Sequence, residues 1–270
     1  MNVLNEYYTL HNGVRIPKLG FGTAPLKGDE AYQAVLNALK VGYRHIDTAQ
    51  IYKNEEEVGR AIEDSNIPRK DLFITSKLDP KIKTYDGAIE YFEDTLRRIG
   101  TDYLDLYLIH APWPWEDVGS DHKSGNVEAF KAMETLYKEG KVRAIGVSNF
   151  DIEDLENIFD HCETIPHVNQ IKIHIGHPQD KLIAFSKNHD IQVEAYSPLG
   201  RSDVLSNDTV KALADDYKVS PAQIAIRYLL EKHLLPLPRS KNPNHIENNA
   251  AVNFVINPVD IAKLDKLTIA

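Results

Sequence analysis

The chain has 270 residues, of which 42% are hydrophobic, and its 31 basic and 40 acidic side chains give a net charge of −9. This length fits one large α/β barrel or two modest domains, and the acidic balance without a basic run excludes a general nucleic-acid-binding face. No apolar run reaches the roughly eighteen residues that span a bilayer, so we expect no membrane span.

The first ten residues, MNVLNEYYTL, lack the basic and apolar regions of a secretory signal peptide. A single cysteine, Cys162, excludes an internal disulfide and suits a reducing compartment. We therefore expect a cytoplasmic protein with a small-molecule partner and without a nucleic-acid or membrane partner.

Residues 7–20 alternate roughly as two strands around the tripeptide HNG at 11–13. Asn-Gly is a strong signal for a two-residue hairpin turn, so we expect a β-hairpin that caps something larger. The glycine pair at 20–22 follows, but Pro25 takes the place of the third glycine of a dinucleotide-binding fingerprint. That fingerprint is therefore rejected.

From residue 29 onward one unit repeats, a helical stretch followed by a short apolar strand. Strands are expected near 18–22, 43–47, 72–77, 104–110, 142–147, 168–171, 191–195 and 234–238, and helices near 29–41, 54–65, 84–99, 126–139, 151–160, 178–189, 207–217, 221–232, 243–250 and 258–267. Strands that alternate with helices are parallel, and eight such units in about 250 residues are typical of a (β/α)8 TIM barrel.

We therefore predict an α/β fold in which residues 1–270 form a single (β/α)8 barrel domain with an N-terminal β-hairpin and extra C-terminal helices. A doubly wound sheet is the alternative, and the missing glycine fingerprint weighs against its dinucleotide-binding form. Two inserts stand out, residues 111–125 after the fourth strand and residues 200–206 after the seventh.

Polar side chains gather where the predicted strands end, and in such barrels this face carries the active site. They are Asp47, with Tyr52 five residues later, then Lys77, His110, Ser148, Asn149, Gln170, Tyr196 and Ser197. Each one alone is better explained by capping, packing or a lysine that reaches the surface. Together they bring an acid, a phenol, an ammonium and an imidazole to one end of one barrel, which packing does not explain.

These groups suit the protonation of an oxygen while a hydride reaches its carbon. A phenol has a reference pKa of about 10, and a neighbouring ammonium lowers it. We therefore expect Lys77 to activate Tyr52, and Asp47 to keep the ammonium charged. An imidazole at His110 can orient a substrate carbonyl oxygen. General acid catalysis of this kind contributes about 10²- to 10⁴-fold.

Seven motifs in order along the chain carry a resemblance to a known family. They are GFGT at 20–23, GYRHIDTAQIYKNEEEVG at 42–59, ITSKL at 74–78, DYLDLYLIH at 102–110, GKVRAIGVSNF at 140–150, VNQI at 168–171 and EAYSPLG at 194–200. With them the chain resembles the aldo-keto reductase superfamily, as a short bacterial-type member similar to diketogluconate reductase-like enzymes. The resemblance implies a (β/α)8 barrel that interconverts carbonyls and alcohols with a nicotinamide cofactor.

The resemblance also implies roles for individual residues. Its catalytic tetrad maps onto Asp47, Tyr52, Lys77 and His110, with Tyr52 as general acid. Its cofactor contacts map onto Gly22 and Thr23 in the first loop, Ser148, Asn149 and Gln170 at the carboxamide, Tyr196 on the nicotinamide ring, Ser197 and Leu199 at the pyrophosphate, and Arg239, Ser240, Asn242, His245 and Asn249 at the adenosine end.

The adenosine end decides which cofactor we expect. A guanidinium at Arg239 suits a 2′-phosphate, and a helix N-terminus near residues 242–244 adds partial positive charge. His245 stands where the family often has arginine, which weakens this preference. We expect NADPH, with NADH as an alternative.

Departures from the family pattern fall in the substrate pocket. Ala24 and Ala111 occupy places where many relatives have tryptophan, and Trp113 and Trp115 nearby are candidates for the apolar wall. The chain ends at Ala270 without the long tail loop of longer relatives, so we expect an open pocket that accepts many carbonyls. His174 and His177 lack a third ligand, so no metal site is expected.

Two other functions compete with an NADPH-dependent reductase of aldehydes, ketones or keto-sugars. One is a nucleotide-binding regulatory or redox-sensing barrel without turnover, which the intact tetrad argues against. The other is a Schiff-base aldolase that uses Lys77, which the cofactor loop argues against. A monomer is the expectation from the family, and the natural substrate, the stereochemistry and the direction in the cell are not readable from the sequence.

Overall fold

The computed structural model describes residues 2–269, without the side chains of residues 201 and 202. After a 3-10 helix, η1 (Val3–Asn5), strands β1 (Tyr7–Thr9) and β2 (Arg15–Pro17) pair antiparallel and form the predicted hairpin. Its turn is longer than the two residues predicted: the Leu10 N–H donates to the Val14 carbonyl (2.9 Å), which leaves residues 11–13 as a three-residue loop. Gly13, at φ +85°, supplies the left-handed residue that closes such loops.

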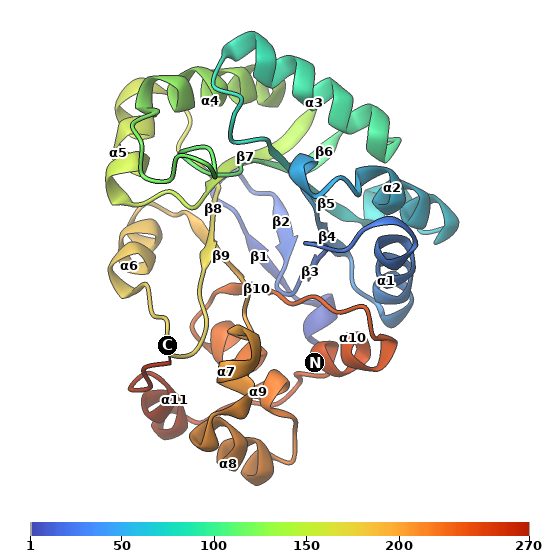
Figure 1. Ribbon diagram of the computed structural model, residues 1–270, viewed down its shortest axis with the longest axis vertical. Coiled ribbons are helices and arrows are strands. Elements are labelled where there is room, and N and C mark those ends of the chain that lie inside the picture. Colours follow the sequence, from blue (N-terminus) through green and yellow to red (C-terminus); the bar gives the residue numbers. More distant parts are fainter. Residues whose placement is uncertain (1, 270) are drawn as a thin grey trace.

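Eight parallel strands follow, each paired with its neighbours along the chain. They are β3 (Phe21–Gly22), β4 (His45–Asp47), β5 (Phe73–Leu78), β6 (Leu104–Ile109), β7 (Val142–Ser148), β8 (Val168–Lys172), β9 (Gln192–Tyr196) and β10 (Leu235–Leu237). The ring closes because the Gly20 N–H donates to the Pro236 carbonyl (3.2 Å) and the Gly22 N–H to the Pro238 carbonyl (3.0 Å). Figure 1 shows the strands in the centre of the molecule with helices around them. The predicted (β/α)8 barrel is therefore confirmed.

Helices surround the ring, as Figure 1 shows. They are α1 (Gly28–Val41), α2 (Glu55–Asp64), α3 (Tyr85–Ile99), α4 (Lys123–Lys138), α5 (Ile152–His161), α6 (Asp180–Asn188), α7 (Arg201–Ser206), α8 (Asp208–Tyr217), α9 (Pro221–Glu231), α10 (Pro243–Ala250) and α11 (Pro258–Leu264), with 3-10 turns η2 (Gln50–Tyr52) and η3 (Arg69–Asp71). Several begin where the sequence encodes a cap: Thr84, Asp151 and Ser220 each accept a backbone N–H of the first turn.

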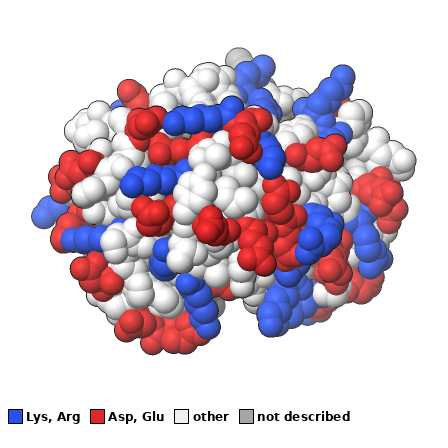
Figure 2. Space-filling view, turned by 90° about the horizontal axis from the view of Figure 1, so that it is seen from above, with Lys and Arg blue, Asp and Glu red and all other residues white. Residues whose placement is uncertain are grey.

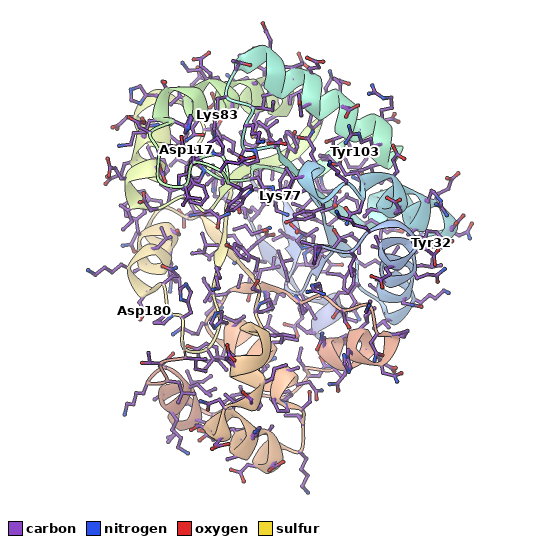
Figure 3. The ribbon with its side chains drawn as sticks, viewed as in Figure 1. Tyr32, Lys77, Lys83, Tyr103, Asp117 and Asp180 are labelled. Carbon is purple, nitrogen blue, oxygen red and sulfur yellow. The ribbon has the colours of Figure 1, made fainter. Side chains whose placement is uncertain are left out.

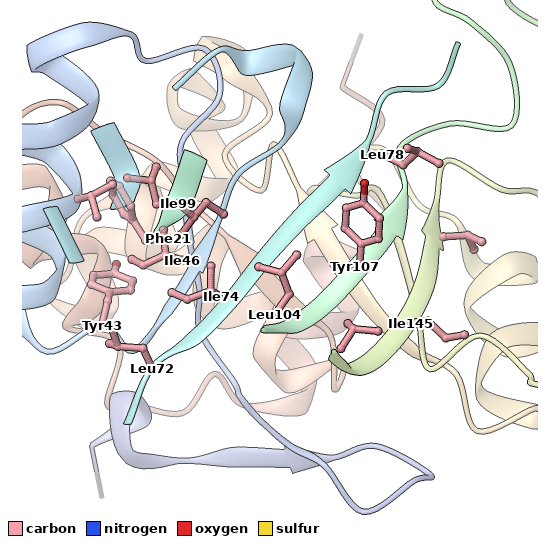
Figure 4. Close-up of a cluster of buried hydrophobic side chains, with 14 of the residues drawn as sticks. Phe21, Tyr43, Ile46, Leu72, Ile74, Leu78, Ile99, Leu104, Tyr107 and Ile145 are labelled. Atoms are coloured by element: carbon pink, nitrogen blue, oxygen red, sulfur yellow. The ribbon is translucent and has the colours of Figure 1, made fainter. Parts of the chain in front are cut away.

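Outward-facing strand residues and the inner faces of the helices form the main apolar core. Ile46, Ile74 and Tyr107 are fully buried in it, and Figure 4 shows them with Leu104 and Ile145. Each such side chain stabilises the fold by about 1.5–3 kcal/mol relative to exposure. This core joins strands to helices and leaves the barrel interior to other side chains.

Inside the barrel, side chains change from apolar at one end to polar at the other. Leu10 and Ile16 of the hairpin cover the first end and pack in one cluster with Phe73 of β5. Because alternate residues of a strand face the same side, the next inward residues of β5 are Thr75 and then Lys77. The polar end of the interior therefore lies where the strands end.

The surface mixes charges of both signs, and on the face shown in Figure 2 acidic and basic side chains are interspersed. None of the helices in residues 2–269 has the length and apolarity of a bilayer-crossing segment. That residues 1–270 form a single domain stays a prediction.

Candidate functional site

A cleft of about 660 Å³ opens at the C-terminal ends of the barrel strands. Many of the predicted residues line it: Gly22, Ala24, Asp47, Tyr52, His110, Trp115, Ser148, Asn149, Gln170, Tyr196, Ser197, Leu199 and Arg239. Lys77, labelled within the ring in Figure 3, is fully buried beneath the cleft.

Lys77 and Asp47 form a buried ion pair on neighbouring strands. The Lys77 ammonium donates to Asp47 Oδ1 (2.6 Å) and to the Thr48 carbonyl (2.8 Å). Burial alone would lower the pKa of Lys77, but the Asp47 carboxylate and the hydrogen bond to it, with a contribution from the Tyr52 phenol, more than offset burial and hold the pKa above its ordinary value. Lys77 is therefore a buried cation under the cleft at neutral pH.

Tyr52 lies in a loop that is anchored by side-chain hydrogen bonds, and not in a strand. It ends the 3-10 turn η2, whose Gln50 side chain donates to the Tyr91 carbonyl (2.6 Å) and accepts from the Asp79 N–H (2.9 Å). Lys53, at φ +54°, turns the chain into α2. Side-chain hydrogen bonds thus take the place of strand pairing in holding the turn that carries the phenol.

The Tyr52 phenol lies between Lys77 and His110. The Lys77 Nζ atom is 5.2 Å from the centre of its ring, and its hydroxyl is 3.4 Å from His110 Nε2. Burial raises the pKa of Tyr52 by more than the Lys77 charge lowers it, so the net direction is opposite to the one expected from the sequence. The phenol therefore keeps its proton at neutral pH, with a cation at hand to stabilise the anion.

His110 is a neutral imidazole in this site. Burial, assisted by the Lys77 charge, holds its pKa well below the ordinary range. Its Nδ1 atom is buried without a hydrogen-bond partner among the described residues. Its Nε2 atom faces Tyr52, so the ring can offer one N–H to an oxygen in the cleft.

Ser148, Asn149 and Tyr196 form a connected polar wall. The Asn149 amide donates to the His110 carbonyl (3.0 Å) and to Ser148 Oγ (3.0 Å), and its oxygen accepts from the Tyr196 hydroxyl (2.8 Å). The Ser148 hydroxyl donates to the Gln170 carbonyl (2.8 Å). Asn149, at φ +61°, takes the left-handed conformation that asparagine tolerates better than most residues.

Gln170 joins this wall to the ion pair and to the carboxyl of Glu194, which is not among the predicted site residues. Its amide nitrogen donates both to Asp47 Oδ2 (2.8 Å) and to Glu194 Oε2 (2.7 Å). Glu194 is fully buried one inward position before Tyr196 on β9. A charged residue on the same strand face as Tyr196 was the available signal.

Several predicted cofactor residues lie outside the cleft wall. Thr23 is buried, and its N–H and hydroxyl both donate to the Asp47 carbonyl (3.0 Å each). Ser240 and Asn242 form the turn into α10, where Ser240 Oγ accepts from the Asn242 N–H (3.0 Å). His245 is exposed on that helix and Asn249 is buried in it. Arg239, in contrast, is exposed at the edge of the cleft.

The predicted apolar wall divides in two. Ala24 and Trp115 line the cleft, and the Trp115 ring meets the His110 ring edge-on at 5.8 Å. Ala111 is fully buried, because it follows the inward-facing His110 and so faces outward. Trp113 packs against Trp115 at 5.1 Å instead of lining the cleft.

Other residues line the cleft without having been predicted. Ile51, Leu205 and Leu237 add apolar surface, and Leu205 comes from helix α7 in the insert of residues 200–206. The rings of His174 and His177 stack at 5.3 Å. Within residues 2–269, no group of three or more His, Cys, Asp or Glu side chains is placed to hold a metal ion.

The profile of the aldo/keto reductase family matches residues 18–269. The chain is 41% identical over 266 residues to the glyoxal reductase of Bacillus subtilis (strain 168), which covers 98% of this chain and 93% of that protein. The solved structure of an aldo-keto reductase from a Medee basin deep-sea metagenome library superposes with a TM-score of 0.92 at 40% identity, covering 97% of this chain and 94% of that one. The Bombyx mori aldo-keto reductase in complex with NADP superposes with a TM-score of 0.88 at 32% identity, covering 97% and 92%.

Proposed function

The chain belongs to the aldo/keto reductase family, and from this premise we propose that it reduces aldehydes and ketones to alcohols with NADPH, with Tyr52 as general acid. One observation carries the proposal. The Tyr52 hydroxyl faces the cleft 3.4 Å from a neutral imidazole, with the buried Lys77 ammonium 5.2 Å from its ring. A protonated phenol beside a fixed cation is what the protonation of a carbonyl oxygen requires.

Family membership confirms the predicted enzyme class, an NAD(P)H-dependent oxidoreductase, and the predicted cofactor, NADPH. The donor set in the cleft fits that cofactor. Ser148, Asn149 and Gln170 would hold a carboxamide, and Tyr196 offers an aromatic face to the ring. Arg239 at the edge of the cleft would hold a 2′-phosphate, because a guanidinium binds phosphate through two parallel hydrogen bonds.

NADPH, when bound, supplies a hydride to the substrate carbon. His110 donates a hydrogen bond that orients the carbonyl oxygen toward Tyr52. The Tyr52 hydroxyl transfers its proton to that oxygen as the carbon–oxygen double bond becomes single. Lys77 stabilises the resulting phenolate, and Asp47 keeps the ammonium charged so that the stabilisation is present throughout.

The substrates we propose are small aldehydes and ketones, with keto-sugars among the candidates. The wall is apolar at Trp115, Leu205 and Ile51 and polar at Tyr52 and His110, so it fits a carbonyl group with a modest apolar or hydroxylated substituent. The similar Bacillus subtilis protein is named a glyoxal reductase, which favours small dicarbonyls as first compounds to test.

The test is to follow oxidation of NADPH, and separately of NADH, with a panel of aldehydes, ketones and keto-sugars. We expect Tyr52→Phe to lower the rate by about 10²- to 10⁴-fold, the contribution of a general acid, without loss of NADPH binding. The matched control is Tyr107→Phe, which removes a buried phenol hydroxyl behind β6, outside the cleft, and should react at the wild-type rate. A Tyr52→Phe enzyme as fast as wild type would refute the mechanism.

A further inference from the structure

The side-chain amide of Gln170 has one free atom. Both hydrogens of its nitrogen are used, one by Asp47 Oδ2 (2.8 Å) and one by Glu194 Oε2 (2.7 Å). No group in the described part of the chain donates to its oxygen, and Gln170 lines the cleft. With its nitrogen held toward the interior by two carboxyl groups, the amide presents its oxygen to whatever occupies the cleft.

Of the two carboxyl groups that bind the Gln170 amide, that of Glu194 lies deeper in the barrel, because Asp47 lines the cleft and Glu194 does not. It is fully buried, and its second oxygen, Oε1, lies 3.9 Å from His45 Nε2 without a hydrogen bond. His45 in turn contacts Thr75 Oγ1 (2.9 Å), and Gly20 leaves the room for it: a Cβ atom there would lie 2.7 Å from His45 Nδ1. None of these groups lines the cleft, and among the described residues the cleft residue that Glu194 contacts by a hydrogen bond is Gln170.

We propose that Glu194 is a positioning residue of this enzyme: together with Asp47 it fixes the orientation of the Gln170 amide, so that the amide oxygen accepts a hydrogen bond from the carboxamide NH2 of the nicotinamide. This inference rests on the proposed function. Without Glu194, one hydrogen of the Gln170 amide would lose its acceptor, and the amide could rotate and place its nitrogen in the cleft. A nitrogen there repels the carboxamide NH2 instead of binding it.

The protonation of Glu194 is compatible with this role. Burial, assisted by the charge of Asp47, raises the pKa of Glu194 to about 8, while the Gln170 bond and Lys77 act against it. A neutral carboxyl with its proton on Oε1 still accepts from Gln170 through Oε2. When Glu194 is neutral, Asp47 is the carboxylate in this network that balances the positive charge of Lys77.

The experiment compares two cofactors in binding alone. Dissociation constants are measured by quenching of tryptophan fluorescence, since Trp115 lines the cleft, for NADPH and for its reduced 3-acetylpyridine analogue, in which a methyl group replaces the carboxamide NH2. Wild type should prefer NADPH. Glu194→Met, of similar length but without an acceptor, should narrow this preference about fivefold to tenfold, the worth of one hydrogen bond.

Two variants serve as controls. Glu194→Gln retains an oxygen acceptor and should keep most of the preference. Gln192→Met removes an amide on the same face of β9 that, among the described residues, donates to the Val193 and His233 carbonyls, and it should leave the ratio unchanged. A folded Glu194→Met protein with the wild-type ratio would overturn the role of Glu194. Wild type that binds neither nucleotide would overturn the proposed function itself.

A measurement on the wild-type protein covers the case in which Glu194→Met does not fold. With 15N-glutamine labelling, the Gln170 side-chain NH2 signal is assigned by its loss in Gln170→Glu. We expect two inequivalent protons that exchange slowly with solvent, because both are bonded to buried carboxyl groups. Rapid exchange or rapid rotation of that amide would contradict the proposal.

Discussion

The two ends of the barrel interior are built from the same strands, yet their chemistry is opposite. At the end covered by the hairpin, Ile16 packs against Phe73 and other apolar side chains. At the open end, Lys77, Asp47 and Gln170 form a bonded polar set. On β5 the whole change, from Phe73 to Lys77, takes four residues along the chain.

This contrast separates stability from chemistry. The apolar end needs no particular geometry beyond close packing, and it stabilises the ring by excluding water. At the polar end the Lys77 ammonium is paired with Asp47 and hydrogen-bonded, since a buried ion is tolerated only when it is paired. We therefore expect substitutions at the two ends to have different consequences, one on unfolding and the other on turnover or cofactor binding.

The largest expected effect at the hairpin end is on folding. Ile16 is fully buried, so Ile16→Ala should lower the free energy of unfolding by about 2–5 kcal/mol, and the milder Ile16→Val by about 0.5–1.5 kcal/mol. The folded fraction should keep the wild-type turnover number. Urea unfolding and rate measurements at low temperature check both points. An Ile16 variant with wild-type stability but an altered turnover number would show that the hairpin end contributes to catalysis and not to stability.

At the open end, Arg239→Ala should change the choice of cofactor. A guanidinium on a 2′-phosphate makes charge-assisted hydrogen bonds, so NADPH binding should weaken by about 10- to 100-fold while NADH binding stays near wild type. Lys241→Ala is the matched control, because that neighbouring cation is paired with Glu30 at 2.9 Å. Equal losses for the two cofactors would show that Arg239 does not contact the phosphate.

The positions of the strand-end residues could be predicted because parallel strands in a barrel all end on one rim. That rule alone places Asp47, Lys77 and His110 near the same cleft. Because successive side chains of a strand point to opposite faces, the sequence also indicates that Ala111 faces away from the barrel interior and that Glu194 faces inward with Tyr196.

What could not be predicted depends on packing between distant segments. The pKa of Tyr52 is set by burial, which no local pattern of sequence encodes. Trp113 and Trp115 lie in an irregular insert, residues 111–125, whose sequence has no period that tells which side chain faces the cleft. In the structure Trp115 lines the cleft and Trp113 packs against it. The three-residue turn of the hairpin likewise differs from the two-residue turn by a single αL residue, Gly13.

The last effect we predict is a slope of stability with pH, which is gradual within any one pH unit and arises from a residue between the two ends. Glu194 is faced by His45, Asp47 and Lys77, and its pKa is raised from 4.5 to about 8 on folding. Between these two pH values the folded protein holds a proton that the unfolded chain has released. This contribution to stability is therefore present at low pH and is lost as pH rises through the window, by at most about 1.4 kcal/mol per pH unit.

Glu194→Gln cannot release that proton, so the difference in free energy of unfolding between wild type and this variant should decline from about pH 5 to about pH 8 and then level off. His45 also contributes a slope in this range, since burial and Lys77 lower its pKa to about 3 on folding, but it is present in both proteins and so cancels in the difference. Urea unfolding of the two proteins across these pH values gives the difference directly. If this difference in free energy of unfolding does not change with pH, Glu194 is ionised in the folded barrel. The middle of the interior would then carry a charge, as the open end does.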